Sequence, residues 1–223
     1  MQYNMNTSNY ISKDIKPLLL TDKISNAKKL FNSLTCTHLP IIKEGNFIGL
    51  IAENDIQTII EDNQSISEYY YLIQSFFALE NANWFELLKI FAINETTIIP
   101  VVTNKQKYLG YYELADILNI FNNTPFLNQS GAVVVISKDV NDYSFSEISQ
   151  IVESNNAKVL GAFISKIDKE FVEVTLKISD HDLNNTIQSF RRYNYSILNN
   201  FHFDEYLNTL KERSDYLQKY LNM

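Results

Sequence analysis

The chain has 223 residues, of which 45% are hydrophobic, and it includes 14 Phe and 14 Tyr. This composition is ample for a packed core and excludes an intrinsically disordered chain. The formal net charge of −7 is spread over both halves, so no basic face for nucleic acid is expected.

The sequence also lacks the signals of secretion and membrane insertion. Cys36 is the only cysteine, so no intrachain disulfide can form, which suits a reducing compartment. Residues 1–11 are polar and lack the apolar core of a signal peptide. No apolar run approaches the roughly 18 residues of a membrane-spanning helix. We therefore expect a cytoplasmic protein without membrane contact.

The first predicted elements form a helix, two strands and a second helix. An extended lead-in at residues 11–15 precedes an amphipathic helix that Asp22 can cap. Pro40 opens a β-branched strand, residues 43–46 form a polar turn, and a return strand contains Gly49. A glycine inside a strand indicates a bulge or a close backbone approach. Asp55 follows where a helix begins, and a carboxylate in the first helical turn suits the helix macrodipole.

The same arrangement occurs a second time. Residues 98–117 repeat residues 38–56, with Pro100, Gly110 and Asp116 in place of Pro40, Gly49 and Asp55. A period of about 60 residues indicates an internal duplication. A helix at residues 83–94 precedes the second copy, and the apolar, aromatic segment 69–79 is predicted to be its extended lead-in.

The pattern of a proline-opened strand, a turn, a glycine-containing strand and an aspartate resembles the cystathionine-β-synthase (CBS) domain. The resemblance covers about residues 8–123, with one repeat and its lead-in at 1–68 and the other at 69–125. It implies that the two repeats associate into a disc-like module. It also implies that the clefts of this module bind adenine nucleotides.

A different pattern follows from residue 131. Predicted strands at 132–136, 158–165, 171–178 and 195–198 alternate with helices at 145–155 and 182–193. This β-α-β-β-α-β order is the split βαβ, ferredoxin-like arrangement, and it resembles the ACT domain over residues 131–200. The first strand-to-helix loop, 138–144, lacks the glycine usual in ACT domains, so no amino-acid binding is expected there. Residues 201–223 form a C-terminal tail, and the fold class is α/β (α+β).

The CBS resemblance implies which residues touch a ligand. Nucleotide-binding members have Ser or Thr, two residues and then Asp, and the aspartate accepts hydrogen bonds from ribose hydroxyls. Here Asp55 and Asp116 are present, but Ala52 and Glu113 occupy the hydroxyl positions. Because Glu113 would repel a phosphate, we expect the Asp55 cleft to be the better site. The alternative is that both aspartates only stabilise helix starts.

The candidate ligand-binding set also contains Ser12, His38, Leu39 and Ile99. His38 could contact a phosphate at the cleft edge or be a structural histidine. His181 and His202 lack metal-ligand spacing, so no metal site is expected. Cys36 has no adjacent base, and no catalytic constellation is recognisable, so we predict a protein that is not an enzyme.

The layout is similar to that of bacterial acetoin-utilisation regulatory proteins. It predicts a regulatory module for AMP, ADP, ATP or S-adenosylmethionine that acts on a separate target protein. The alternative is a dimerising scaffold with degenerate clefts. We also expect a homodimer, since the helices that follow both aspartates contain the apolar residues Ile56, Ile59, Ile60, Ile117, Leu118, Ile120 and Phe121.

Overall fold

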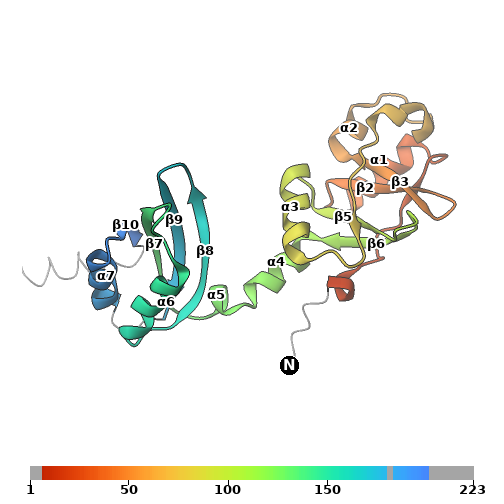
Figure 1. Ribbon diagram of the computed structural model, residues 1–223. Helices are drawn as coiled ribbons and strands as arrows, with labels where there is room; N and C mark the ends of the chain where they lie inside the picture. Colours follow the sequence, from red (N-terminus) through yellow and green to blue (C-terminus); the bar gives the residue numbers. More distant parts are fainter. Residues whose placement is uncertain (1–6, 180–182, 201–223) are drawn as a thin grey trace, which may run out of the picture. The chain divides into compact units, whose positions relative to one another are not determined.

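The computed structural model describes residues 7–179 and 183–200. The chain divides after Phe121 into two compact units, which are described separately (Figure 1). Both units combine helices with β-sheets, so the predicted α/β fold class is confirmed.

The first repeat has the predicted helix–strand–strand–helix order. Its elements are η1 (Thr7–Tyr10), β1 (Leu18–Leu19), α1 (Ile24–Ser33), β2 (His38–Lys43), β3 (Asn46–Ala52) and α2 (Glu53–Thr58). The sheet order is β1-β2-β3. Strand β1 is parallel to β2, and β3 is antiparallel to β2.

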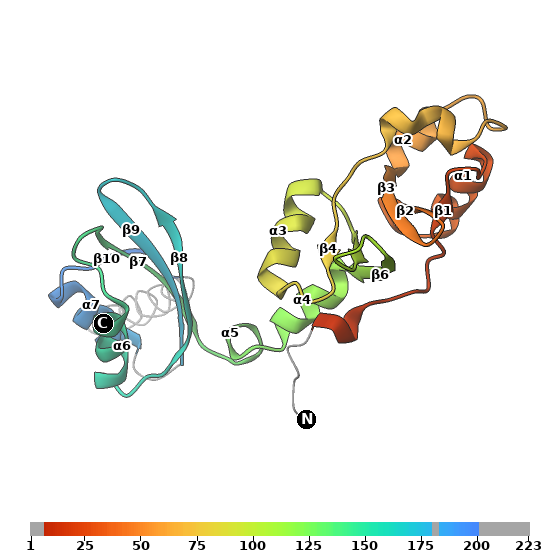
Figure 2. The ribbon, with the colours of Figure 1, turned by 45° about the vertical axis from the view of Figure 1, so that its right-hand side comes forward.

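The second repeat follows the same plan. Its elements are η2 (Ile66–Leu72), β4 (Ala78–Leu79), α3 (Trp84–Asn94), β5 (Ile98–Val102), β6 (Tyr108–Glu113) and α4 (Leu114–Asn122). The sheet order β4-β5-β6 again has one parallel and one antiparallel pair, and Figure 2 shows α3 and α4 beside this sheet.

The start of α1 differs from the prediction. The helix follows Lys23, and no side chain caps it. Asp22 Oδ2 instead accepts a hydrogen bond from the Leu19 N–H at 2.8 Å, so this carboxylate closes the turn after β1. In contrast, α3 begins with a capping box in which Asn83 and Glu86 exchange side-chain and backbone hydrogen bonds.

The extended lead-in predicted at residues 69–79 is also wrong in part. Residues Ile66–Leu72 form the 3-10 helix η2, and Ser65 and Glu68 form a capping box at its start. Only Ala78–Leu79 forms a strand there. The capping box satisfies N–H groups at the start of the helical segment, which favours it over an extended chain.

The prediction for the two strand glycines is confirmed. The β2–β3 register shifts beside the Ile41–Gly49 pair, and the β5–β6 register shifts beside the Val101–Gly110 pair. A Cβ at Gly49 would stand 2.6 Å from the Gln74 carbonyl oxygen, and one at Gly110 would stand 2.3 Å from that of Ser12. Both glycines therefore admit another backbone segment.

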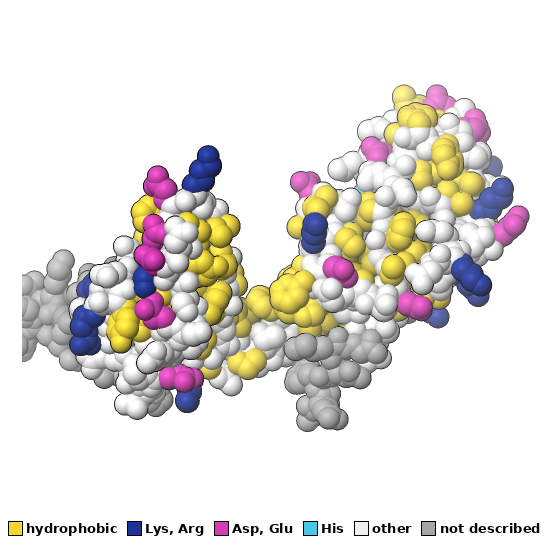
Figure 3. Space-filling view, viewed as in Figure 1, with side chains coloured by type: hydrophobic (Ala, Val, Ile, Leu, Met, Phe, Trp, Pro, Cys, Tyr) yellow, Lys and Arg dark blue, Asp and Glu magenta, His cyan; other side chains and the backbone are white. Residues whose placement is uncertain are grey.

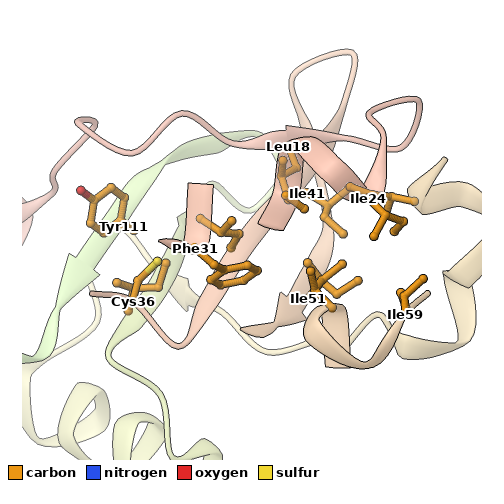
Figure 4. Close-up of a cluster of buried hydrophobic side chains, with 13 residues drawn as sticks. Leu18, Ile24, Phe31, Cys36, Ile41, Ile51, Ile59 and Tyr111 are labelled. Carbon is orange, nitrogen blue, oxygen red and sulfur yellow. The ribbon is translucent and has the colours of Figure 1, made fainter. Parts of the chain in front are cut away.

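At each of these close approaches, the lead-in of one repeat pairs with the sheet of the other repeat. Ser12, ahead of the first repeat, pairs with Tyr111 of β6, while Gln74, ahead of the second, pairs with Leu50 of β3. The core around Phe31 consequently contains Ile98 and Tyr111 from the second repeat (Figure 4). The two repeats thus share backbone hydrogen bonds and a hydrophobic core.

The second unit has the predicted ferredoxin-like order. Its elements are α5 (Pro125–Asn128), β7 (Ala132–Asp139), α6 (Phe145–Ser154), β8 (Val159–Ile167), β9 (Phe171–Ile178), α7 (Leu183–Arg192) and β10 (Ser196–Asn200). The sheet order is β10-β7-β9-β8, and every neighbouring pair is antiparallel. Helices α6 and α7 cover one face of this sheet (Figures 1 and 2).

Alternation along β9 explains this packing. Val172, Val174, Leu176 and Ile178 are buried, while the residues between them are more exposed. On α6, Ile148, Ile151 and Val152 point inward as predicted, but Phe145 is 41% exposed because it lies at the first position of the helix. The predicted helix start at Asp182 and the predicted tail at 201–223 lie outside the described residues.

Candidate functional site

A hollow of about 510 Å³ lies between the two repeats of the first unit. Both repeats and the first lead-in contribute to its walls. The lining residues are Asp14, Ile15, Leu34, Thr35, Cys36, Thr97, Ile98, Tyr111, Glu113, Leu114, Ala115 and Leu118. Its volume falls in the range of small-molecule sites, about 300–1,000 Å³.

Two threonines tie the repeats together beside this hollow. The Thr37 N–H donates to Thr97 Oγ1, and the Thr97 N–H donates to Thr37 Oγ1, both at 3.0 Å. The Thr37 and Thr97 carbonyls accept hydrogen bonds from the N–H groups of Glu53 and Leu114, at the starts of α2 and α4. The contact is therefore reciprocal, as expected for two related halves with two related clefts.

Tyr111 joins the lead-in to the wall of the hollow. Its hydroxyl accepts hydrogen bonds from Ser12 Oγ at 3.1 Å and from the Ile15 N–H at 3.3 Å. Burial raises the pKa of Tyr111, the hydrogen bonds from Ser12 and Ile15 act in the opposite direction, and the nearby Glu113 carboxylate raises the pKa again. Tyr111 therefore remains a protonated phenol that holds the lead-in against β6.

Cys36 lies at the same end of the core as Tyr111 (Figure 4). Burial, together with the nearby carboxylates of Glu53 and Glu113, raises the pKa of its thiol to about 11. A thiol with this pKa is protonated at neutral pH and is a poor nucleophile. The geometry thus supports the prediction that Cys36 is a small core residue.

His38 lies near Asp55 and packs against other side chains of the protein. The His38 ring is buried and stands edge-on to the Phe76 ring, with 5.5 Å between centroids. A hydrogen bond of 2.9 Å joins His38 Nδ1 to Thr37 Oγ1. Burial lowers the pKa of His38, although Gln74 and Asp55 act in the opposite direction. His38 is thus packed as a structural, neutral histidine.

The predicted site residues are distributed unequally around the hollow. Asp116 lies in the first turn of α4, directly after the lining residue Ala115, and Ser12 contacts Tyr111. Asp55 lies in the first turn of α2, on the side of His38. Leu39 and Ile99 are fully buried in separate cores rather than in the wall. The described hollow therefore lies on the Asp116 side, and the expectation that the Asp55 cleft is the better ligand site stays a prediction.

Sequence reasoning missed two contributors, Asp14 and Tyr111. Both depend on pairing between the first lead-in and β6, about 100 residues further along the chain. The one sequence signal for this contact was Gly110, which indicated a close backbone approach without naming its partner.

The charged side chains that line the described hollow are both acidic. Asp14 and Glu113 bring carboxylates to the wall, and none of the described residues that line it is basic. Within residues 7–179 and 183–200, no group of three or more His, Cys, Asp or Glu side chains could hold a metal ion. The arrangement can hold an apolar ring and accept hydrogen bonds at its edge.

The first strand-to-helix loop of the second unit is organised by its own side chains. Asp139 Oδ1 accepts hydrogen bonds from the backbone N–H of Asn141 at 2.9 Å and from its side-chain amide at 3.1 Å. Ser144 accepts a hydrogen bond from the Glu147 N–H and so caps α6. The carboxylate of Asp139 is therefore engaged in shaping the loop.

No helix within the described part of the chain has the length and hydropathy needed to cross a membrane. A search of curated proteins found no significant match to the chain.

Several solved structures are similar to the chain at low identity. A CBS domain pair/ACT domain protein from Thermotoga maritima is 18% identical, with 52% of this chain and 96% of that chain covered and a TM-score of 0.47. The CBS domains of a transcriptional regulator from Streptococcus pneumoniae are 16% identical, covering 51% and 97%, with a TM-score of 0.45. A CBS protein in complex with AMP, CBSX2, is 13% identical, covering 52% and 95%, with a TM-score of 0.44.

The CBS domain family matches residues 8–62. This range holds the first lead-in and the complete helix–strand–strand–helix order of the first repeat, and residues 66–122 repeat that order. Residues 8–62 thus match the CBS domain, and residues 66–122 repeat the same architecture.

Proposed function

We propose that the chain is a cytoplasmic regulatory module that binds an adenosine-containing ligand between its two CBS repeats. The observation that carries the proposal is the hollow, whose walls come from both repeats and from the first lead-in. A ligand in such a position contacts two halves of the unit at once. Its binding energy can therefore depend on how the halves are arranged.

Regulation follows if the two arrangements differ in affinity for the ligand. A ligand shifts a conformational equilibrium only as far as its affinities for the two states differ. The reciprocal Thr37–Thr97 contact lies beside the hollow and links the starts of α2 and α4. In this proposal the ACT-like second unit passes the change to a separate target protein, and the chain itself catalyses no reaction.

A thermal-shift screen of the full chain tests this function. The panel contains adenosine, AMP, ADP, ATP, S-adenosylmethionine and the free amino acids. A ligand present at about 100 times its Kd stabilises the folded state by about 2.7 kcal/mol, which raises the melting temperature by several degrees. We expect adenosine-containing compounds to raise it and amino acids to leave it unchanged. No shift with any adenosine-containing compound at millimolar concentration would contradict the proposal.

The second candidate is a dimerising scaffold. It is favoured by exposed apolar side chains such as Phe163 and Ile167, and Figure 3 shows hydrophobic side chains gathered over β8. It is also favoured by the packing of Phe76 against His38 near Asp55. A dimer that binds none of the panel would select this function over ligand sensing.

A further inference from the structure

We propose that the hollow selects an adenosine-type ligand without phosphate groups, either neutral or cationic, because its described lining contains carboxylates and no balancing cation. This inference rests on the proposed function and narrows its ligand class.

The negative charge is fixed by the fold rather than carried on free side chains alone. Glu113 ends β6 and lies in the wall, two residues after Tyr111 in the same strand. Tyr111 is itself fixed by Ser12 and by the backbone of Ile15. Asp14 brings a second carboxylate from the lead-in. The backbone that carries both carboxylates is therefore held in place by the pairing of the lead-in with β6.

No cation of the lining set offsets these carboxylates. The closest lysines in sequence to Asp14 are Lys13 and Lys16, and neither lines the hollow. Lys16 instead lines a separate groove beside α1 with Pro17 and Asp22. Repulsion between like charges in a cleft is several times stronger than in bulk water. A phosphate dianion would meet this repulsion, and an uncharged ribose would not.

The amino end of α4 does not offset the repulsion between these carboxylates and a phosphate. Helix starts attract anions, and Leu114 and Ala115 reach the hollow. However, the Leu114 N–H donates to the Thr97 carbonyl at 3.0 Å. The carboxylates of Glu113 and Asp116 already stand at this end of the helix, where they occupy its favourable field.

The same walls suit a nucleoside. Ile15, Leu34, Ile98 and Leu118 offer apolar surface for a purine ring. Carboxylates at the edge can accept hydrogen bonds from ribose hydroxyls and can attract a positive charge such as a sulfonium. Adenosine and S-adenosylmethionine therefore represent the neutral and cationic members of the expected class, and AMP represents the excluded one.

Calorimetric titration of the full chain with these three compounds tests the inference. We expect adenosine and S-adenosylmethionine to bind at least about tenfold more tightly than AMP. Glu113→Gln should lower the ratio of the affinity for adenosine to the affinity for AMP, since it removes one carboxylate and keeps the shape of the side chain. Glu44→Gln, the same change on an exposed turn of the same unit, should leave the ratio as it is.

The possible outcomes separate this inference from the proposed function. AMP binding as tightly as adenosine, or more tightly, overturns the charge selection while ligand sensing stands. Equal ratios in Glu113→Gln and the unchanged chain overturn the role given to Glu113. Binding of none of the three compounds at millimolar concentration overturns both the inference and the proposed function.

Discussion

Gly110 determines, at the scale of one residue, whether the first lead-in can reach β6. Its φ is +149°, and an added Cβ would stand 2.3 Å from the Ser12 carbonyl oxygen and 2.7 Å from Ile11 Cγ2. Two backbone hydrogen bonds between Ser12 and Tyr111, of 2.8 and 3.0 Å, depend on this approach.

We expect Gly110→Ala to lower the free energy of unfolding by about 2 kcal/mol or more, because a backbone atom cannot move aside cheaply. Gly45→Ala is the control, since Gly45 also has a positive φ but no atom within 4 Å of its added Cβ. It should cost only the conformational penalty, about 1 kcal/mol. Urea denaturation measures both, and equal losses would contradict the close-contact explanation.

His38 gives the first unit a pH dependence whose sign is set by burial. Its pKa in the folded state is lower than the ordinary value of about 6.5, mainly because burial disfavours the charged ring. The unfolded chain therefore binds a proton at higher pH than the folded chain does. The stability is fully present above about pH 6.5 and is lost as the pH falls from there through the folded pKa.

His38→Ile tests this interpretation, because Ile98 occupies the matching position of the second repeat. The variant should show a smaller loss of stability between about pH 7.5 and 5.5 than the unchanged chain does. Urea midpoints at three pH values give the comparison. Identical pH dependence in the two proteins would exclude His38 as the titrating group.

At the scale of elements, the two related helices of the first unit differ in how they begin. Asn83 accepts a hydrogen bond from the Glu86 N–H at 3.0 Å, whereas Lys23 provides no side-chain cap to α1. Asn83→Ala should therefore cost about 1 kcal/mol. Lys23→Ala, at the matching cap position, should change the stability very little. Similar losses in the two variants, measured by urea denaturation, would count against the capping assignment.

The elements themselves were largely predictable from local patterns. The prolines and glycines of the duplicated stretch marked both hairpins, and alternating apolar residues such as Val172 and Val174 marked β9. The 3-10 segment η2 was missed because its aromatic residues also suit a strand, while the Ser65–Glu68 capping signal was overlooked. The walls of the described hollow were beyond local reasoning, since Tyr111 contacts Ser12, which is distant from it in the sequence.

At the scale of the whole molecule, the described structure leaves several large apolar side chains exposed. Of the residues expected to mediate dimerisation, Ile56, Ile59 and Ile117 are buried within the first unit, so their part of that expectation is corrected. Ile60 and Leu118 remain exposed. In the second unit β8 is an edge strand that carries exposed Phe163 and Ile167. Edge strands of this kind can pair with a second copy.

We therefore predict a homodimer. Light scattering at micromolar concentration should give about twice the chain mass of 25.9 kDa. Ile167→Lys should shift the mass toward the monomer, because a charged side chain on an edge strand opposes pairing. A mass near 25.9 kDa for the unchanged chain would contradict the prediction.

The proposed ligand binds in the hollow between the repeats, on the Asp116 side. Leu118 lines this hollow from α4, and Gln57 is its counterpart on α2, near Asp55; both side chains are exposed. A tryptophan at either position should therefore be compatible with folding, but only Leu118→Trp should fill the hollow.

Calorimetric titration of both variants with adenosine is the most direct test. The account predicts that Leu118→Trp weakens binding by at least about tenfold, which corresponds to about 1.4 kcal/mol, and that Gln57→Trp binds as the unchanged chain does. Undiminished binding by Leu118→Trp together with weakened binding by Gln57→Trp would place the ligand beside Asp55 and contradict the account.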